Sequence, residues 1–130
     1  MITEDYVSLE TAKLLKEKGF DEEVRTFYSY DSEIKTWEFE EDDRWDTPNS
    51  WGYGEYYLSA PTLQMAMKWL REVHKCFIEI KEYFDIKQYQ AFVSKYGKTT
   101  YCEPDWFHPI CNSYEEACEA AIKYCLENLI

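Results

Sequence analysis

The stretch from Ser59 to Ile80 constrains the fold of this chain more than any other, because its hydrophobic period changes midway. In its first part, apolar residues recur three and four positions apart, which places them on one face of a helix. These residues are Leu63, Ala66, Met67, Leu70 and Val73. Pro61 and Thr62 are alternative starting points, since proline suits a first helical turn and threonine can cap one.

After His74 the period of the same stretch falls to two. Cys76, Ile78 and Ile80 alternate with Phe77, Glu79 and Lys81. This alternation is typical of a strand with one buried face. The stretch therefore predicts a helix that packs on a sheet.

Two further helices have clear boundary signals. Ser8 can cap a helix through about residue 18, and Gly19 can end it with Phe20 packed back on Leu15, as in a Schellman ending. Near the C-terminus, Ser113 and Glu116 form a capping box in front of an apolar stripe. That stripe predicts a helix from about Tyr114 to Asn128, with Tyr114, Cys118, Ala121, Ile122, Cys125 and Leu129 on one face.

The remaining strands are predicted from β-branched and aromatic residues. Residues 24–30 and 34–39 flank Asp31-Ser32-Glu33, a plausible hairpin loop, and residues 88–96 form a fourth strand. The predicted order is α-β-β-α-β-β-α. We therefore expect a single α+β domain over residues 1–130, with helices on one face of an antiparallel sheet of about four strands.

The charge of the chain excludes several classes of partner. The net charge is −12, and residues 1–60 hold 16 acids against 6 bases. Clustered negative charge opposes direct binding to nucleic acids or anionic lipid. The N-terminus lacks the basic and apolar regions of a signal peptide, and the longest uncharged run is far shorter than a membrane span. These features predict a cytoplasmic protein.

The cysteines and histidines give little support to metal or catalytic chemistry. The five cysteines are an odd set without a Cys-x-x-Cys pair, so we expect reduced thiols. Cys102, His108 and Cys111 could hold zinc, with Cys76 or Asp105 as a fourth ligand, or form a thiol nucleophile, but only His108 and Cys111 have the spacing of a paired ligand set. No phosphate loop, nucleophile elbow or cofactor motif occurs. We predict a non-enzymatic protein with no catalytic residue, metal or cofactor.

An acidic and aromatic segment is the candidate working surface. Residues 38–46 hold six acids against one base, which predicts a solvated loop, and turn residues follow. The candidate partner-binding residues are Trp37, Trp45, Trp51, Tyr53 and Tyr56. Their rings either fill the second face of the sheet or bind a protein with a basic surface.

Two other uses of this segment stay open at the level of sequence. A pocket lined by Trp45, Trp51 and Tyr53 would make the chain a small-molecule binding module. A flat aromatic patch, or one buried in a symmetric homodimer, would favour protein interaction.

Three segments carry a resemblance to other proteins. Residues 8–20, 60–74 and 114–117 resemble a family of small acidic proteins of unknown function from Bacteroides-type genomes and their phages or mobile elements. The resemblance implies a bacterial accessory protein of phage type and transfers no functional residue. Such an origin suggests a further hypothesis, that the acids imitate DNA and occupy a host nucleic-acid-binding protein.

Overall fold

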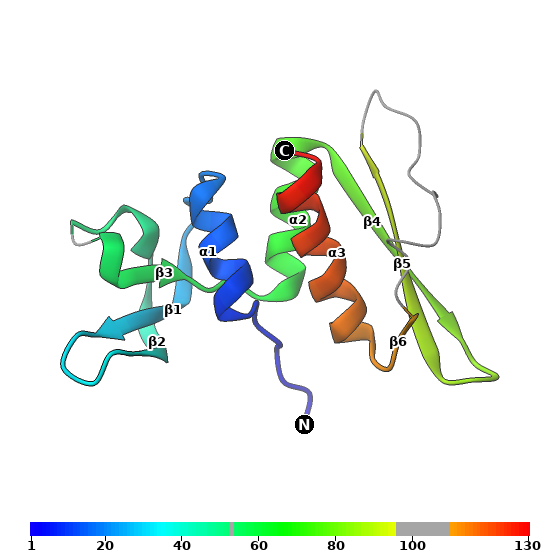
Figure 1. Ribbon diagram of the computed structural model, residues 1–130, viewed down its shortest axis with the longest axis horizontal. Coiled ribbons are helices and arrows are strands. Elements are labelled where there is room, and N and C mark those ends of the chain that lie inside the picture. Colours follow the sequence, from blue (N-terminus) through cyan, green and yellow to red (C-terminus); the bar gives the residue numbers. More distant parts are fainter. Residues whose placement is uncertain (53, 96–109) are drawn as a thin grey trace. The chain divides into compact units, whose positions relative to one another are not determined.

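The computed structural model describes residues 1–52, 54–95 and 110–130. Apart from the first three residues, the chain divides into two compact units, Glu4–Thr62 and Leu63–Ile130, which we call the N-terminal and C-terminal units. Figure 1 shows the elements of each unit. The units are described separately below.

The N-terminal unit begins with helix α1, Leu9–Glu17, whose two ends are as predicted. The backbone N–H of Thr11 donates to the Ser8 hydroxyl at 3.2 Å, so Ser8 is the N-cap. At the other end, Phe20 N–H donates to Leu15 C=O at 2.9 Å, and Gly19 adopts a φ of +87°. These features confirm the Schellman ending.

The sheet of this unit contains β1, Val24–Asp31, β2, Thr36–Asp46, and β3, Tyr57–Ser59, in the order β2-β1-β3. Both pairings are antiparallel (Figure 1). Two short 3-10 helices, Pro48–Ser50 and Gly54–Tyr56, connect β2 to β3. The edge strands of this sheet are β2 and β3.

The prediction of a loop over residues 38–46 was wrong, because this acidic run forms most of β2. The strand pairs with β1 from Thr36 to Glu41, and its register shifts by a bulge before Asp46 pairs with Val24. As an edge strand it leaves nearly all its side chains in solvent, so its carboxylates are not desolvated. Charge alone therefore did not prevent strand formation.

The C-terminal unit begins with α2, Leu63–His74, whose buried face differs from the predicted one. Leu63, Ala66 and Leu70 are buried as expected, but Val73 is 53% exposed and Trp69 is buried instead. The edge of the Trp69 ring meets the His74 ring, with centroids 4.6 Å apart. The large indole buries more apolar area than valine would, which favours this rotation of the helix.

The sheet of the C-terminal unit consists of β4, Cys76–Tyr83, β5, Gln88–Lys95, and β6, Ile110–Cys111, in the order β4-β5-β6. Its pairings are also antiparallel. Cys76, Ala91 and Val93 lie on the face towards the helices and are buried. The odd-numbered residues of β4 lie on the other face, as the alternation predicted.

Helix α3, Tyr114–Asn128, matches its predicted bounds. The Ser113 hydroxyl accepts from Glu116 N–H, and the Glu116 carboxylate accepts from Asn112 N–H, one residue before the expected donor. The helix contacts α2 and all three strands of its unit (Figure 1). It therefore buries more than one stripe, and Ala117, Tyr124 and Leu126 join the predicted core.

The α+β class and the antiparallel pairing are confirmed, but the single four-stranded sheet and the predicted order are wrong. The structure has two three-stranded sheets, because β3 and β6 each add a short strand to a pair of predicted strands. β3 pairs with the first strand of its hairpin and β6 with the second, so the units do not share one topology. Within the described residues, no helix combines the length and apolar character that a membrane span requires. The single domain over residues 1–130 stays a prediction.

Candidate interaction surface

The candidate residues lie in the N-terminal unit, and Tyr53 falls outside the described residues. Successive residues of a strand point to opposite faces of a sheet, so Phe27 and Tyr28 of β1 define two faces. The described candidates do not form one patch. They divide between these two faces and the exposed end of β2.

Trp37 and Tyr56 belong to the face of the sheet that α1 covers. Tyr30 links them, because its ring lies 5.2 Å from Trp37 and is stacked on Tyr56 at 6.2 Å. The Lys13 ammonium of α1 lies 5.7 Å from the centre of the Trp37 ring, within the range of a cation–π contact. These rings therefore form a packed row beside α1.

Trp51 lies on the opposite face of the sheet, against Phe27. The two rings meet edge to face at 5.1 Å, and Tyr57 meets Trp51 in the same way at 4.9 Å. Contacts of this geometry stabilise aromatic clusters beyond the area that they bury. Trp51 therefore helps to fill the second face of the sheet. Of the two roles that the sequence left open for these rings, packing on the sheet and binding a partner, this is the first.

Among the described candidates, of which Tyr56 is also 36% exposed, Trp45 is the most exposed. Its side chain is 59% exposed, and it lies where β2 departs from regular pairing with β1. A large ring at such a position leaves apolar area in water that a partner could cover. Of the described candidates, Trp45 is the one that fits a contact residue best.

Acidic side chains surround Trp45 along β2. Glu38, Glu40, Glu41, Asp42, Asp43 and Asp46 belong to this strand, and only Asp42 is half-buried. In the part of the chain that the structure describes, none of the six forms an ion pair, and the recorded pair joins Arg71 to Glu72. The acidic residues of the strand make hydrogen bonds, including one from the Ser29 hydroxyl to Glu40 and one from Arg25 Nε to the Asp42 carbonyl at 3.1 Å. The negative charge of β2 is therefore exposed and not neutralised.

Lys16 has a positioning role that the sequence did not reveal. Its ammonium donates to the carbonyl of Gly54 and, at 3.0 Å, to that of Tyr57. Partial burial lowers its pKa below the usual lysine value. These bonds hold the segment that carries Tyr56 against α1. Helical periodicity could not predict them, because both acceptors are backbone groups of a distant segment.

The four described cysteines, Cys76, Cys111, Cys118 and Cys125, are buried and not disulfide-bonded. Burial raises the pKa of Cys118 to about 11, and burial followed by the nearby Glu116 raises the pKa of Cys111. A hydrogen bond with Cys76, and then burial, raises the pKa of Cys125. Among the residues that the structure describes, no three cysteine, histidine or acidic side chains form a metal-binding group. Cys102 and His108 lie outside the described residues.

A shallow groove lies on the outer face of the C-terminal sheet. Its volume is about 320 Å³, and its lining includes Phe77, Glu79, Lys81 and Phe92. The exposure of Phe77 leaves an apolar ring beside one acid and one base. The alternation of β4 was the sequence signal for this outer face, but above it served only to predict the buried side of the strand.

The resemblance to small acidic proteins of Bacteroides-type genomes rests on residues 8–20, 60–74 and 114–117 and stays a prediction. The geometry described above is what supports a functional proposal. No protein-family model, curated protein or solved structure matches this chain.

Proposed function

We propose that this chain is a non-enzymatic interaction protein that binds a protein partner with a basic surface along β2. The observation that carries the proposal is the pairing of an exposed Trp45 with unneutralised acids on an edge strand. Tryptophan supplies binding energy when a partner desolvates it, and the acids would speed the encounter with a basic surface. We place the protein in the bacterial cytoplasm, as an accessory protein of phage or mobile-element type.

The backbone of β2 adds to this surface. One edge of the strand pairs with β1, and β2 is the last strand of its sheet. An outer edge presents N–H and C=O groups to which an extended peptide can add as a further strand. A segment rich in lysine or arginine would satisfy these groups and the carboxylates together.

The other hypotheses have less support in the geometry. Trp51 packs against its neighbours on one face, while Trp45 is exposed on β2, so the two do not converge on a common hollow. A DNA mimic needs acids in an extended row, but acids of the N-terminal unit also lie on α1, on the connection to β1 and on the hairpin turn. Protein interaction requires no such regular spacing.

The test is an affinity capture from bacterial lysate with four matched baits. Wild type is compared with Trp45→Ala, with Glu41→Lys/Asp43→Lys on β2, and with Glu22→Lys/Glu23→Lys in the connection after α1. The last two variants change the net charge equally but at different places. We expect wild type and the Glu22/Glu23 variant to capture the same basic protein, and the two β2 variants to lose it. Salt should release the captured protein, because exposed charges are screened.

Equal capture by all four baits would contradict the proposal. Loss of binding in both charge variants would indicate a response to net charge alone, without a site on β2. Capture of a nucleic-acid-binding protein that DNA displaces would favour the mimic instead.

A further inference from the structure

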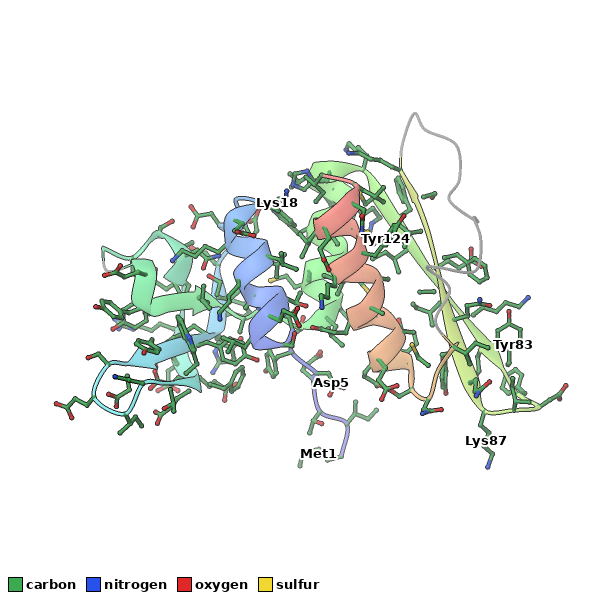
Figure 2. All side chains as sticks on the ribbon, in the orientation of Figure 1. Met1, Asp5, Lys18, Tyr83, Lys87 and Tyr124 are labelled. Atoms are coloured by element: carbon green, nitrogen blue, oxygen red, sulfur yellow. The ribbon has the colours of Figure 1, made fainter. Side chains whose placement is uncertain are left out.

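Strand β4 is an edge strand with a composition unlike that of β2. The order β4-β5-β6 pairs one side of β4 with β5 and leaves its other side at the edge of the described sheet. The strand is eight residues long, and its outer face carries Phe77, Glu79, Lys81 and Tyr83. Figure 2 shows Tyr83 towards the tip of the β4–β5 hairpin, at the far end of β4 from Phe77.

The charges on the two edges have different consequences for self-association. Six acids against one base on β2 would repel a second β2, which is a common protection against edge-to-edge pairing. The whole of β4 has two acids, Glu79 and Glu82, against one base, Lys81, so its net repulsion is much smaller. Phe77 is 41% exposed, which leaves apolar area for a partner to cover.

The register of a β4–β4 pair follows from symmetry and charge. In such a dimer, a two-fold axis perpendicular to the sheet relates the two antiparallel β4 strands. Residues directly opposite each other lie on the same face of the sheet, so the axis must pass midway between one central residue and its own copy, which lies directly opposite it. The two strands pair over the greatest length when this central residue is Glu79 or Ile80. The first sets Glu79 against Glu79 of the second copy, and like charges directly opposite destabilise a sheet. The second sets Glu79 against Lys81 of the second copy, twice.

The same register also matches the aromatic residues. With Ile80 on the two-fold axis, Phe77 lies opposite Tyr83 of the second copy at each end of the pair. Lys81 already lies over the Tyr83 ring, with the ammonium 5.2 Å from its centre. One arrangement therefore gives two opposite-charge pairs, two aromatic pairs and a central Ile80 pair, which are favourable cross-strand combinations. It also sets Ile78 opposite Glu82 of the second copy, twice, on the face of the sheet that carries Ile80.

We infer that the chain forms a homodimer through antiparallel β4–β4 pairing centred on Ile80, which joins two three-stranded sheets into one of six strands. The occupant of the β4 edge is a second copy of this chain. This inference is independent of the basic partner proposed for β2.

A charge swap tests the inference. Glu79→Lys and Lys81→Glu each create two like-charge pairs in the dimer, while the double variant Glu79→Lys/Lys81→Glu restores two opposite-charge pairs. Sedimentation equilibrium should show wild type and the double variant as dimers of the 15.7 kDa chain. Each single variant should dimerise at least about tenfold more weakly. The control Glu127→Lys, an exposed residue of α3, makes the same charge change as Glu79→Lys and should leave the dimer unchanged.

Amide hydrogen exchange locates the contact. Dilution below the dissociation constant should increase exchange in β4 more than in β2. A monomeric wild type at about 1 mM, the limit of weak affinity, would overturn the inference. A dimer unaffected by either single variant, or one that the double variant fails to restore while its circular dichroism is native, would also overturn it.

Discussion

Asn49 and Ser59 form two hydrogen bonds with each other across the connection between β2 and β3. Ser59 N–H donates to the Asn49 side-chain oxygen at 2.9 Å, and Asn49 N–H donates to the Ser59 hydroxyl at 3.1 Å. The Asn49 amide also donates to the Phe20 carbonyl at 2.8 Å, so one side chain joins this connection to the end of α1. Because Ser59 is fully buried, water cannot replace these partners.

Asn49→Ala should therefore destabilise the protein by about 2–4 kcal/mol, since it removes two side-chain bonds and leaves buried groups unsatisfied. Urea denaturation measures the loss. Asn49→Asp is the matched comparison, because it keeps the acceptor for Ser59 and replaces the donor to Phe20 with an oxygen. It should also destabilise the protein, because a carboxylate oxygen then faces the Phe20 carbonyl oxygen without a proton between them. Equal stability of all three proteins would refute this account.

Gly19→Ala should cost about 1 kcal/mol, because Gly19 adopts a φ of +87° that residues with a Cβ atom disfavour. No atom lies within 4 Å of a Cβ built at that position, so the cost is conformational and not steric. Gly52→Ala is the control. A Cβ there is equally unobstructed and the backbone is not left-handed, so this substitution should be neutral or slightly stabilising. A matching loss in both variants, measured by thermal unfolding, would be inconsistent with this explanation.

Trp51→Ala and Trp45→Ala should differ in stability. Trp51 is half-buried and contacts two rings on the face opposite α1, so its loss should cost about 2–4 kcal/mol. Trp45 is mostly exposed and should cost less than about 0.5 kcal/mol. Chemical denaturation of both variants decides the point. A large loss for Trp45→Ala would assign that ring to the core and remove it from the proposed binding surface.

The helix caps can show whether the two units unfold together. Ser8→Ala and Ser113→Ala each remove one capping bond, in different units, and each should cost about 1 kcal/mol. If residues 1–130 are a single domain, both substitutions should lower one common transition temperature in calorimetry. Two transitions, each moved by only one substitution, would contradict the single-domain prediction.

Alkaline pH should destabilise the C-terminal unit through its buried thiols. The pKa of Cys118 is about 11 in the folded protein against 9.0 for an ordinary thiol, so the unfolded chain loses its proton first. Because the pKa of Cys118 is higher in the folded state, its protonated thiol contributes to the stability of the fold. This contribution is complete below pH 9 and is lost as the pH rises towards about 11. The free energy of unfolding should fall by about 1–2 kcal/mol over this range. Cys118→Ala should show a shallower decline, and an equal slope in both proteins would rule out Cys118 as the source.

The sequence by itself determined the elements whose signals are local. Ser8 and Gly19 fixed the ends of α1, and Ser113 with its apolar stripe fixed α3, because a cap, a left-handed glycine and a helical period act within a few residues. The alternation of β4 was also sufficient to identify its buried face. In the candidate surface, the sequence named the candidate rings but could not separate packed from exposed ones.

Only the tertiary structure decided the features that depend on distant partners. The acids of residues 38–46 became a strand because β1 supplied hydrogen bonds at a solvent-exposed edge, and Trp69 replaced Val73 in the core because packing rotated α2. Lys16 and Asn49 acquired their roles from backbone groups far along the chain. The division into two sheets followed from β3 and β6, which are too short to have a periodic signal and exist through the strands beside them. Trp45 stayed exposed and Trp51 became packed for the same reason, since burial is a property of the assembled unit and not of the residue.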